Sequence, residues 1–160
     1  RLSKLREKLT KSIIEDKADP REIEVALGKL RETPWEGVLD EWGNPDLRHM
    51  TEQIEICAWR PMNDSFLMIG IRTFEKRWSL AALNLNSPEG SNIEIDSINP
   101  SHICEGQDIF LDSIEPHSKK FLRISIGGNP SNIELEISGL VDGEPLAAVP
   151  REALSWEKEE

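Results

Sequence analysis

The chain has 160 residues, of which 38% are hydrophobic and 31% are charged, and its net charge at pH 7 is −11. A chain of this length forms about one domain. Its negative charge argues against nucleic acids and anionic membranes as partners, because both would repel it.

The sequence contains no sign of membrane insertion or secretion. No apolar run reaches the roughly 18 residues of a membrane-spanning helix, and the charged segment 1–10 lacks the apolar core of a signal peptide. Two cysteines, Cys57 and Cys104, are too few for a disulfide scaffold. We therefore expect a cytoplasmic protein with reduced thiols, although one Cys57–Cys104 bridge stays open as an alternative.

The first 33 residues predict a helical hairpin. In segment 2–17 an apolar stripe recurs at spacings of three and four, at Leu2, Leu5, Leu9 and Ile13. A second helix should start at Asp19-Pro20, a capping residue before a proline, and run to about Arg31. Almost all the excess negative charge lies after residue 33, so we expect this helical pair to dock on the acidic part or to mediate self-association.

Residues 34–50 predict a linker anchored by tryptophan. Pro34, Gly37, Gly43 and Pro45 interrupt regular structure, and Trp35 and Trp42 are spaced as in a short helix. Large aromatic side chains in a linker usually pin it to the core.

Residues 51–149 predict an antiparallel β-sandwich of seven or eight strands, because short segments of period two alternate with turn residues. The fold class is therefore α+β. The central element is predicted to be a hairpin over 65–85 with its turn at Glu75-Lys76. Its first strand is apolar on both faces, which indicates a central strand covered on both sides. Residues 99–107 are predicted to be a loop, and residues 150–160 a short helix or charged tail.

A weak metal-site pattern combines His102, Cys104 and His117. His102 and Cys104 would point the same way on an extended segment, and His117 would supply a third ligand. The paired Cys or His signatures of zinc sites are missing, so the preferred interpretation is a buried cysteine beside two surface histidines. No metal and no cofactor is expected.

Catalysis has little support in the sequence. The chain has no G-x-S-x-G elbow, and it has no phosphate-binding glycine motif. A small Cys-dependent hydrolase that pairs Cys104 with His102 or His117 is the weakest of three functional alternatives.

Acidic side chains alternate along two of the predicted strands, at Glu94, Asp96, Glu134 and Glu136. If these strands were neighbours, the four carboxylates would form one acidic face that could dock a basic partner. The competing interpretation is a solvated face that protects the sheet from aggregation.

The favoured function is a non-enzymatic protein-interaction or assembly module, with a protein partner or a second copy as its ligand. The stripe that contains Leu5 and Leu9 could extend as a coiled-coil seam or pack within the molecule. Exposed tryptophans often dominate interfaces, so the candidate anchors are Trp35, Trp42, Trp59 and Trp78. The second alternative is a carbohydrate-binding module, which would be favoured if Trp59 and Trp78 were exposed on one sheet face.

Overall fold

The computed structural model describes residues 20–60, 66–87, 93–127, 132–146 and 152–155. The predicted helix over 2–17, with Leu5 and Leu9, lies outside these residues, so the predicted hairpin remains a prediction. The second helix is α2 (Pro20–Glu32), in close agreement with its predicted bounds. A short helix, α3 (Trp35–Trp42), follows it.

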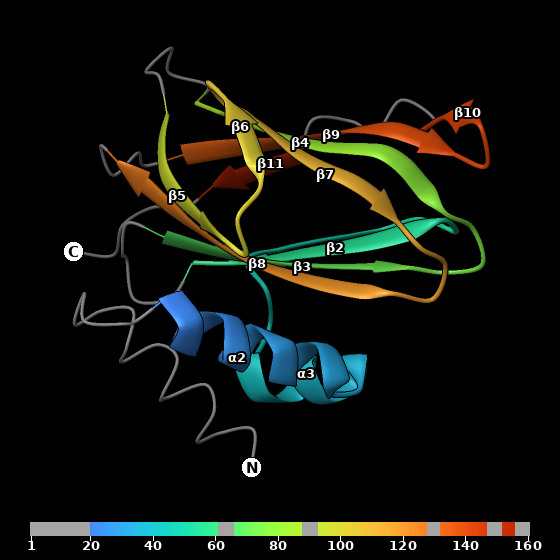
Figure 1. Cartoon of the computed structure of the whole chain (residues 1–160), viewed down its shortest axis with the longest axis horizontal. Helices are drawn as coiled ribbons and strands as arrows, with labels where there is room; N and C mark the ends of the chain where they lie inside the picture. The colour runs from blue at the N-terminus through green and yellow to red at the C-terminus, as the bar shows by residue number, and fades with distance from the viewer. Residues whose placement is uncertain (1–19, 61–65, 88–92, 128–131, 147–151, 156–160) are drawn as a thin grey trace.

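The strands form two antiparallel sheets (Figure 1). Sheet A is five-stranded, in the order β1 (Leu47–Met50), β2 (Ile54–Trp59), β3 (Phe66–Thr73), β8 (Lys119–Gly127) and β5 (Glu94–Asn99). Sheet B is six-stranded, in the order β10 (Glu144–Pro145), β9 (Asn132–Val141), β4 (Trp78–Asn86), β7 (Asp108–Ile114) and β6 (Ile103–Glu105), and β11 (Glu152–Ser155) also pairs with β9. The antiparallel sandwich predicted from the sequence is confirmed, but the described residues form more strands than the seven or eight predicted.

The described elements form three layers, with α2 and α3 over the outer face of sheet A (Figure 1). One apolar core fills the space between the two sheets, and a second lies between the helices and sheet A. Strands β2 and β3 contribute side chains to both cores, so almost every residue in them is buried. The prediction that the first strand of segment 65–85 is central and covered on both faces is therefore confirmed.

Close packing of the helical layer depends on Gly70 in β3. The Trp35 and Phe121 rings stack over this position with centroids 5.8 Å apart. A Cβ atom at Gly70 would lie 2.9 Å from Phe121 Cε1 and 3.2 Å from Trp35 Cη2. Glycine thus allows an indole from α3 to approach the backbone of sheet A.

The predicted hairpin over 65–85 is wrong. β3 pairs with β2 and β8 in sheet A, whereas β4 pairs with β7 and β9 in sheet B. The turn at Glu75-Lys76 therefore crosses from one layer to the other. A second crossing, from β7 to β8, lies beside it: Thr73 N donates to Ser118 O at 2.9 Å, and His117 N donates to Phe74 O at 2.8 Å. The two crossings hydrogen-bond to each other. β3 and β4 do not pair with each other, and each pairs with two other strands of its own sheet.

Three further predictions need correction. Part of the linker, 47–50, forms β1 at the edge of sheet A, and part of the predicted loop over 99–107 forms β6. Residues 152–155 form β11, paired with Asn132–Leu135 of β9, where a helix or tail was predicted. The sheets thus extend beyond the predicted range 51–149 at both ends. Among the described residues, no helix is long and apolar enough to cross a membrane.

Candidate interaction surface

The most buried charge in the described structure is Glu55, a residue that the sequence analysis did not single out. It lies in β2 beneath the helices and is 0% exposed. Arg48 Nε donates to its Oε2 at 2.8 Å, and Arg72 Nε donates to its Oε1 at 2.9 Å. Trp35 Nε1 donates to Oε2 at 3.1 Å. Glu55 therefore ties α3, β1 and β3 together at one carboxylate.

Burial and hydrogen bonding act on the Glu55 pKa in opposite directions. Burial alone would raise the pKa, but the hydrogen bonds from Arg72, Trp35 and Arg48 overcome it and hold the pKa below its usual value. The Arg72 guanidinium also lies between two rings, 5.3 Å from Trp35 and 4.9 Å from Phe74. Because the charge and the donors of Arg72 are satisfied within the protein, we interpret the cluster around Glu55 as structural.

The four candidate tryptophan anchors are all buried, so none presents its ring to a partner. Trp35, Trp42 and Trp59 belong to the core beneath the helices, where the rings of Trp42 and Trp59 meet edge to face at 5.9 Å. Trp78 lies between the two sheets, and its Nε1 donates to Ser138 O at 3.1 Å. Exposure of Trp59 and Trp78 on one face would have favoured the carbohydrate alternative, but the structure places them in different cores.

The residues of the weak metal pattern are not brought together as a site. His102 Nδ1 lies 2.6 Å from Pro100 O, and burial lowers the His102 pKa. Cys104 is exposed rather than buried, and His117 is an exposed turn residue. In the part of the chain that the structure describes, no group of three or more His, Cys, Asp or Glu residues is arranged to hold a metal.

The two cysteines are both free, so the alternative of a Cys57–Cys104 bridge is not realised. Cys57 is buried, and burial raises the pKa of its thiol to about 12. Burial and the nearby Asp108 carboxylate also raise the pKa of Cys104. A nucleophilic cysteine needs the opposite shift, toward the thiolate.

The condition for a single acidic face, that its two strands be neighbours, is not met. Glu94 and Asp96 lie in β5, at the edge of sheet A, whereas Glu134 and Glu136 lie in β9 of sheet B. β5 pairs with β8 and β9 pairs with β4, so the two strands are not neighbours.

The structure instead sorts charge by sheet. Strands β4, β6, β7, β9 and β10 of sheet B contain no Lys, Arg or His, and their charged residues are Glu105, Asp108, Asp112, Glu134, Glu136 and Glu144. The basic residues of the strands are all in sheet A, at Arg48, His49, Arg72, Lys119, Lys120 and Arg123. The charged residues within these five strands of sheet B are therefore all of one sign.

The outer face of sheet B carries apolar side chains beside these carboxylates. Ile103 and Phe110 are register partners on β6 and β7, and they are 70% and 38% exposed. Ala82 on β4 is the next partner in this row. Two residues further along these strands, on the same face, lies a polar row that consists of Glu105, Asp108, Asn84 and Glu136. We call these two rows the outer face of sheet B, and no described helix covers it (Figure 1).

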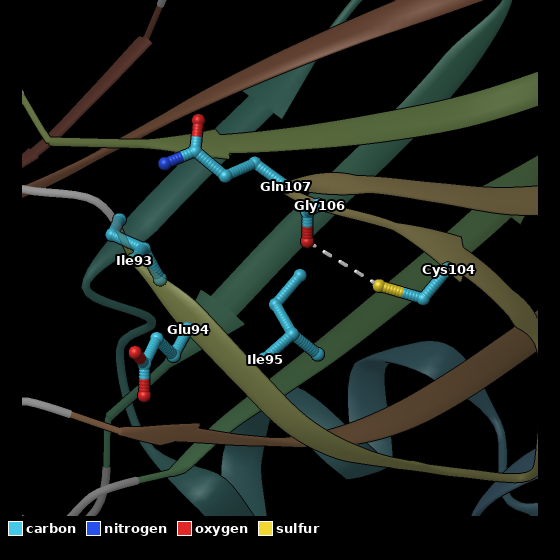
Figure 2. Close-up of a pocket in the computed structure, with 6 residues that line it drawn as sticks. All are labelled: Ile93, Glu94, Ile95, Cys104, Gly106 and Gln107. Atoms are coloured by element: carbon cyan, nitrogen blue, oxygen red, sulfur yellow. Dashed lines mark hydrogen bonds between the residues drawn. The ribbon is translucent and has the colours of Figure 1, made fainter.

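A pocket of about 650 Å³ opens beside this face, between the edge strands β5 and β6. Figure 2 shows Ile95 lying between β5 and the segment that contains Cys104 and Gly106. Glu94 points away from that segment. A smaller hollow of about 390 Å³ lies on the outer face of sheet B, and Gln107 lines both. Gln107 is therefore the residue that the pocket and this hollow share.

Comparison with known proteins adds little to this geometry. No family model and no curated protein matches the chain. A similar solved structure is the GAE domain of GGA2p from Saccharomyces cerevisiae, with 11% sequence identity and a TM-score of 0.33. The alignment covers 66% of this chain and 99% of that chain. At this identity and TM-score, the likeness carries no argument about function.

Proposed function

We propose that this chain is a non-enzymatic protein-interaction module that binds a basic, partly apolar protein segment on the outer face of sheet B. The observation that supports the proposal is the pairing of exposed Ile103 and Phe110 with a sheet whose strands, β11 aside, carry only acidic charge. The opposite outer face, on sheet A, is occupied by α2 and α3. A cytoplasmic location stays a prediction.

Apolar contact and charge would have separate roles in this binding. Fully burying an exposed isoleucine or phenylalanine contributes about 1.5–3 kcal/mol before the cost of association, and Phe110, at 38% exposed, can gain only part of this. Carboxylates such as Asp108 and Glu105 would attract the basic side chains and set the register, more than they would add affinity. Because these carboxylates are exposed, added salt should weaken their contribution.

The environment of Cys104 favours this interaction role over the hydrolase alternative. Cys104 lines the pocket beside β6, but its thiol pKa is raised and its Sγ is directed at Gly106 O, 3.6 Å away (Figure 2). Ile93 and Ile95 supply apolar walls to the same pocket, which suits an apolar side chain of a partner better than a hydrolytic reaction.

The test is a binding titration with a fluorescently labelled peptide that carries leucine and lysine at helical spacing. We expect it to bind the wild-type chain and to bind a double variant, Ile103→Ser with Phe110→Ser, at least about tenfold more weakly, a loss of about 1.4 kcal/mol. The matched control is Val25→Ser, which removes a 60% exposed apolar side chain from α2. Equal affinity in the double variant and the control would refute the proposed surface.

A further inference from the structure

We propose that the outer face of sheet B binds residues 1–18 of a second copy of this chain, so that the protein assembles by exchanging its N-terminal segment. This inference rests on the proposed function and names the partner for the same surface.

The chemistry of the segment matches that of the face. Residues 1–12 contain five basic residues and a single acidic one, Glu7; the basic residues are Arg1, Lys4, Arg6, Lys8 and Lys11. The stripe of Leu2, Leu5 and Leu9 recurs at helical spacing between these charges. The outer face of sheet B offers the reverse combination, with Ile103 and Phe110 beside carboxylates and no basic residue in β4, β6, β7, β9 or β10. Both the apolar and the ionic contacts can therefore be satisfied at once.

The layer order indicates that the segment comes from another copy. α2 begins at Pro20 and packs on the outer face of sheet A, on the far side of the sandwich from the outer face of sheet B (Figure 1). Packed layers are about 10 Å apart, so a helix lying on sheet B would be roughly 30 Å from α2. A helix over 2–17 would leave only Ala18 and Asp19 as a link, which span about 7 Å. A helical segment cannot bridge that separation within one chain. The outer face of sheet B in a second copy can instead lie next to the start of α2.

Reciprocal exchange would give a closed two-fold dimer in which each copy donates one segment and provides one face. This arrangement differs from a coiled coil between two N-terminal segments, which would not involve sheet B. It also differs from face-to-face contact between two copies of sheet B, which like charges would oppose.

The experiment is sedimentation velocity of the full chain over a wide range of concentrations, with two charge-preserving double variants. The segment variant is Leu5→Ser with Leu9→Ser, the face variant is Ile103→Ser with Phe110→Ser, and Val25→Ser is the control. We expect the wild type and the control to associate, and each double variant to associate at least about tenfold more weakly. An equimolar mixture of the two double variants should regain a one-to-one complex, because one retains an intact segment and the other an intact face.

Each alternative gives a different outcome. A coiled coil between segments predicts that the face variant still associates, and face-to-face contact predicts that the segment variant does; either result would overturn the inference. A wild type that stays monomeric would overturn it as well. If that monomer still binds the leucine–lysine peptide through Ile103 and Phe110, the proposed function survives, and if it does not, both fail.

Discussion

Replacing Glu55 by glutamine should be among the most destabilising conservative changes in this protein. Glutamine keeps the size of the side chain but removes its charge, and one carboxylate oxygen becomes an amide nitrogen that can only donate. Arg48, Arg72 and Trp35 also donate at this site, so at least one of these donors would face another donor.

The expected loss is about 2–4 kcal/mol in the free energy of unfolding. Removing one partner of a buried ion pair typically costs about 3–5 kcal/mol. The two guanidinium groups are not fully enclosed, since the side chains of Arg48 and Arg72 are 44% and 25% exposed, so water can solvate part of each after the change. This lowers the estimate toward the cost of one or two buried hydrogen bonds to charged groups. The loss is still a large share of the roughly 5–15 kcal/mol by which domains are stable.

Urea unfolding followed by tryptophan fluorescence and circular dichroism would measure this loss. With a typical slope of about 2 kcal/mol per M, the midpoint should fall by roughly 1–2 M urea. The matched control is Glu36→Gln, because Glu36 is 76% exposed and lies 4.0 Å from the same arginine, Arg72. The control should change stability by less than about 0.5 kcal/mol. If the two variants unfold at the same urea concentration, the carboxylate does not hold the helical layer on sheet A.

Three other predictions follow from the same structure. The Glu55 pKa is lowered on folding, so its contribution is present above the unfolded pKa of about 4.3 and is lost as pH falls through the folded pKa; acid unfolding should therefore be less steep in Glu55→Gln than in the wild type, and equal slopes would contradict this. Gly139→Ala should destabilise by about 2–4 kcal/mol, because its φ is +135° and a Cβ would lie 2.7 Å from Ser79 O, whereas Gly143→Ala, at φ +78° with nothing within 4 Å, should cost only about 1–2 kcal/mol by thermal melting. A thiol reagent followed by mass spectrometry should label exposed Cys104 in the native protein and buried Cys57 only after unfolding, and rapid native labelling of both would show that the core beneath the helices opens.

Several features could be predicted from the sequence because they depend on neighbouring residues. The start of α2 follows from Asp19 and Pro20, and most strands follow from alternation with period two between turn residues. The central, doubly covered position of β3 follows from apolar residues on both of its faces. The short strands β6 and β10 were missed, because three or two exposed residues carry no periodic signal.

The candidate surface could be predicted only in part. The sequence indicated an acidic partner face and an interaction role, but it assigned the face to β5 and β9 and the anchors to tryptophans. Alternation shows which side chains share a face of one strand, but it does not show which strand lies beside it. Burial of the tryptophans likewise depends on α2 and α3 covering sheet A, a contact between residues far apart in the chain.

The sequence by itself determined α2, most of the strands, the antiparallel sandwich and the overall negative charge, because propensity, periodicity and composition are local or additive properties. Only the tertiary structure decided that the chain crosses between sheets at Glu75-Lys76, that Glu55 gathers two arginines from β1 and β3, and that acidic residues predominate in sheet B while the basic residues of the strands lie in sheet A. These results depend on strand pairing between residues far apart in the sequence. Many strand arrangements share the same local pattern, and the hydrogen bonds of the two adjacent crossings, together with the burial of two cores, select one of them.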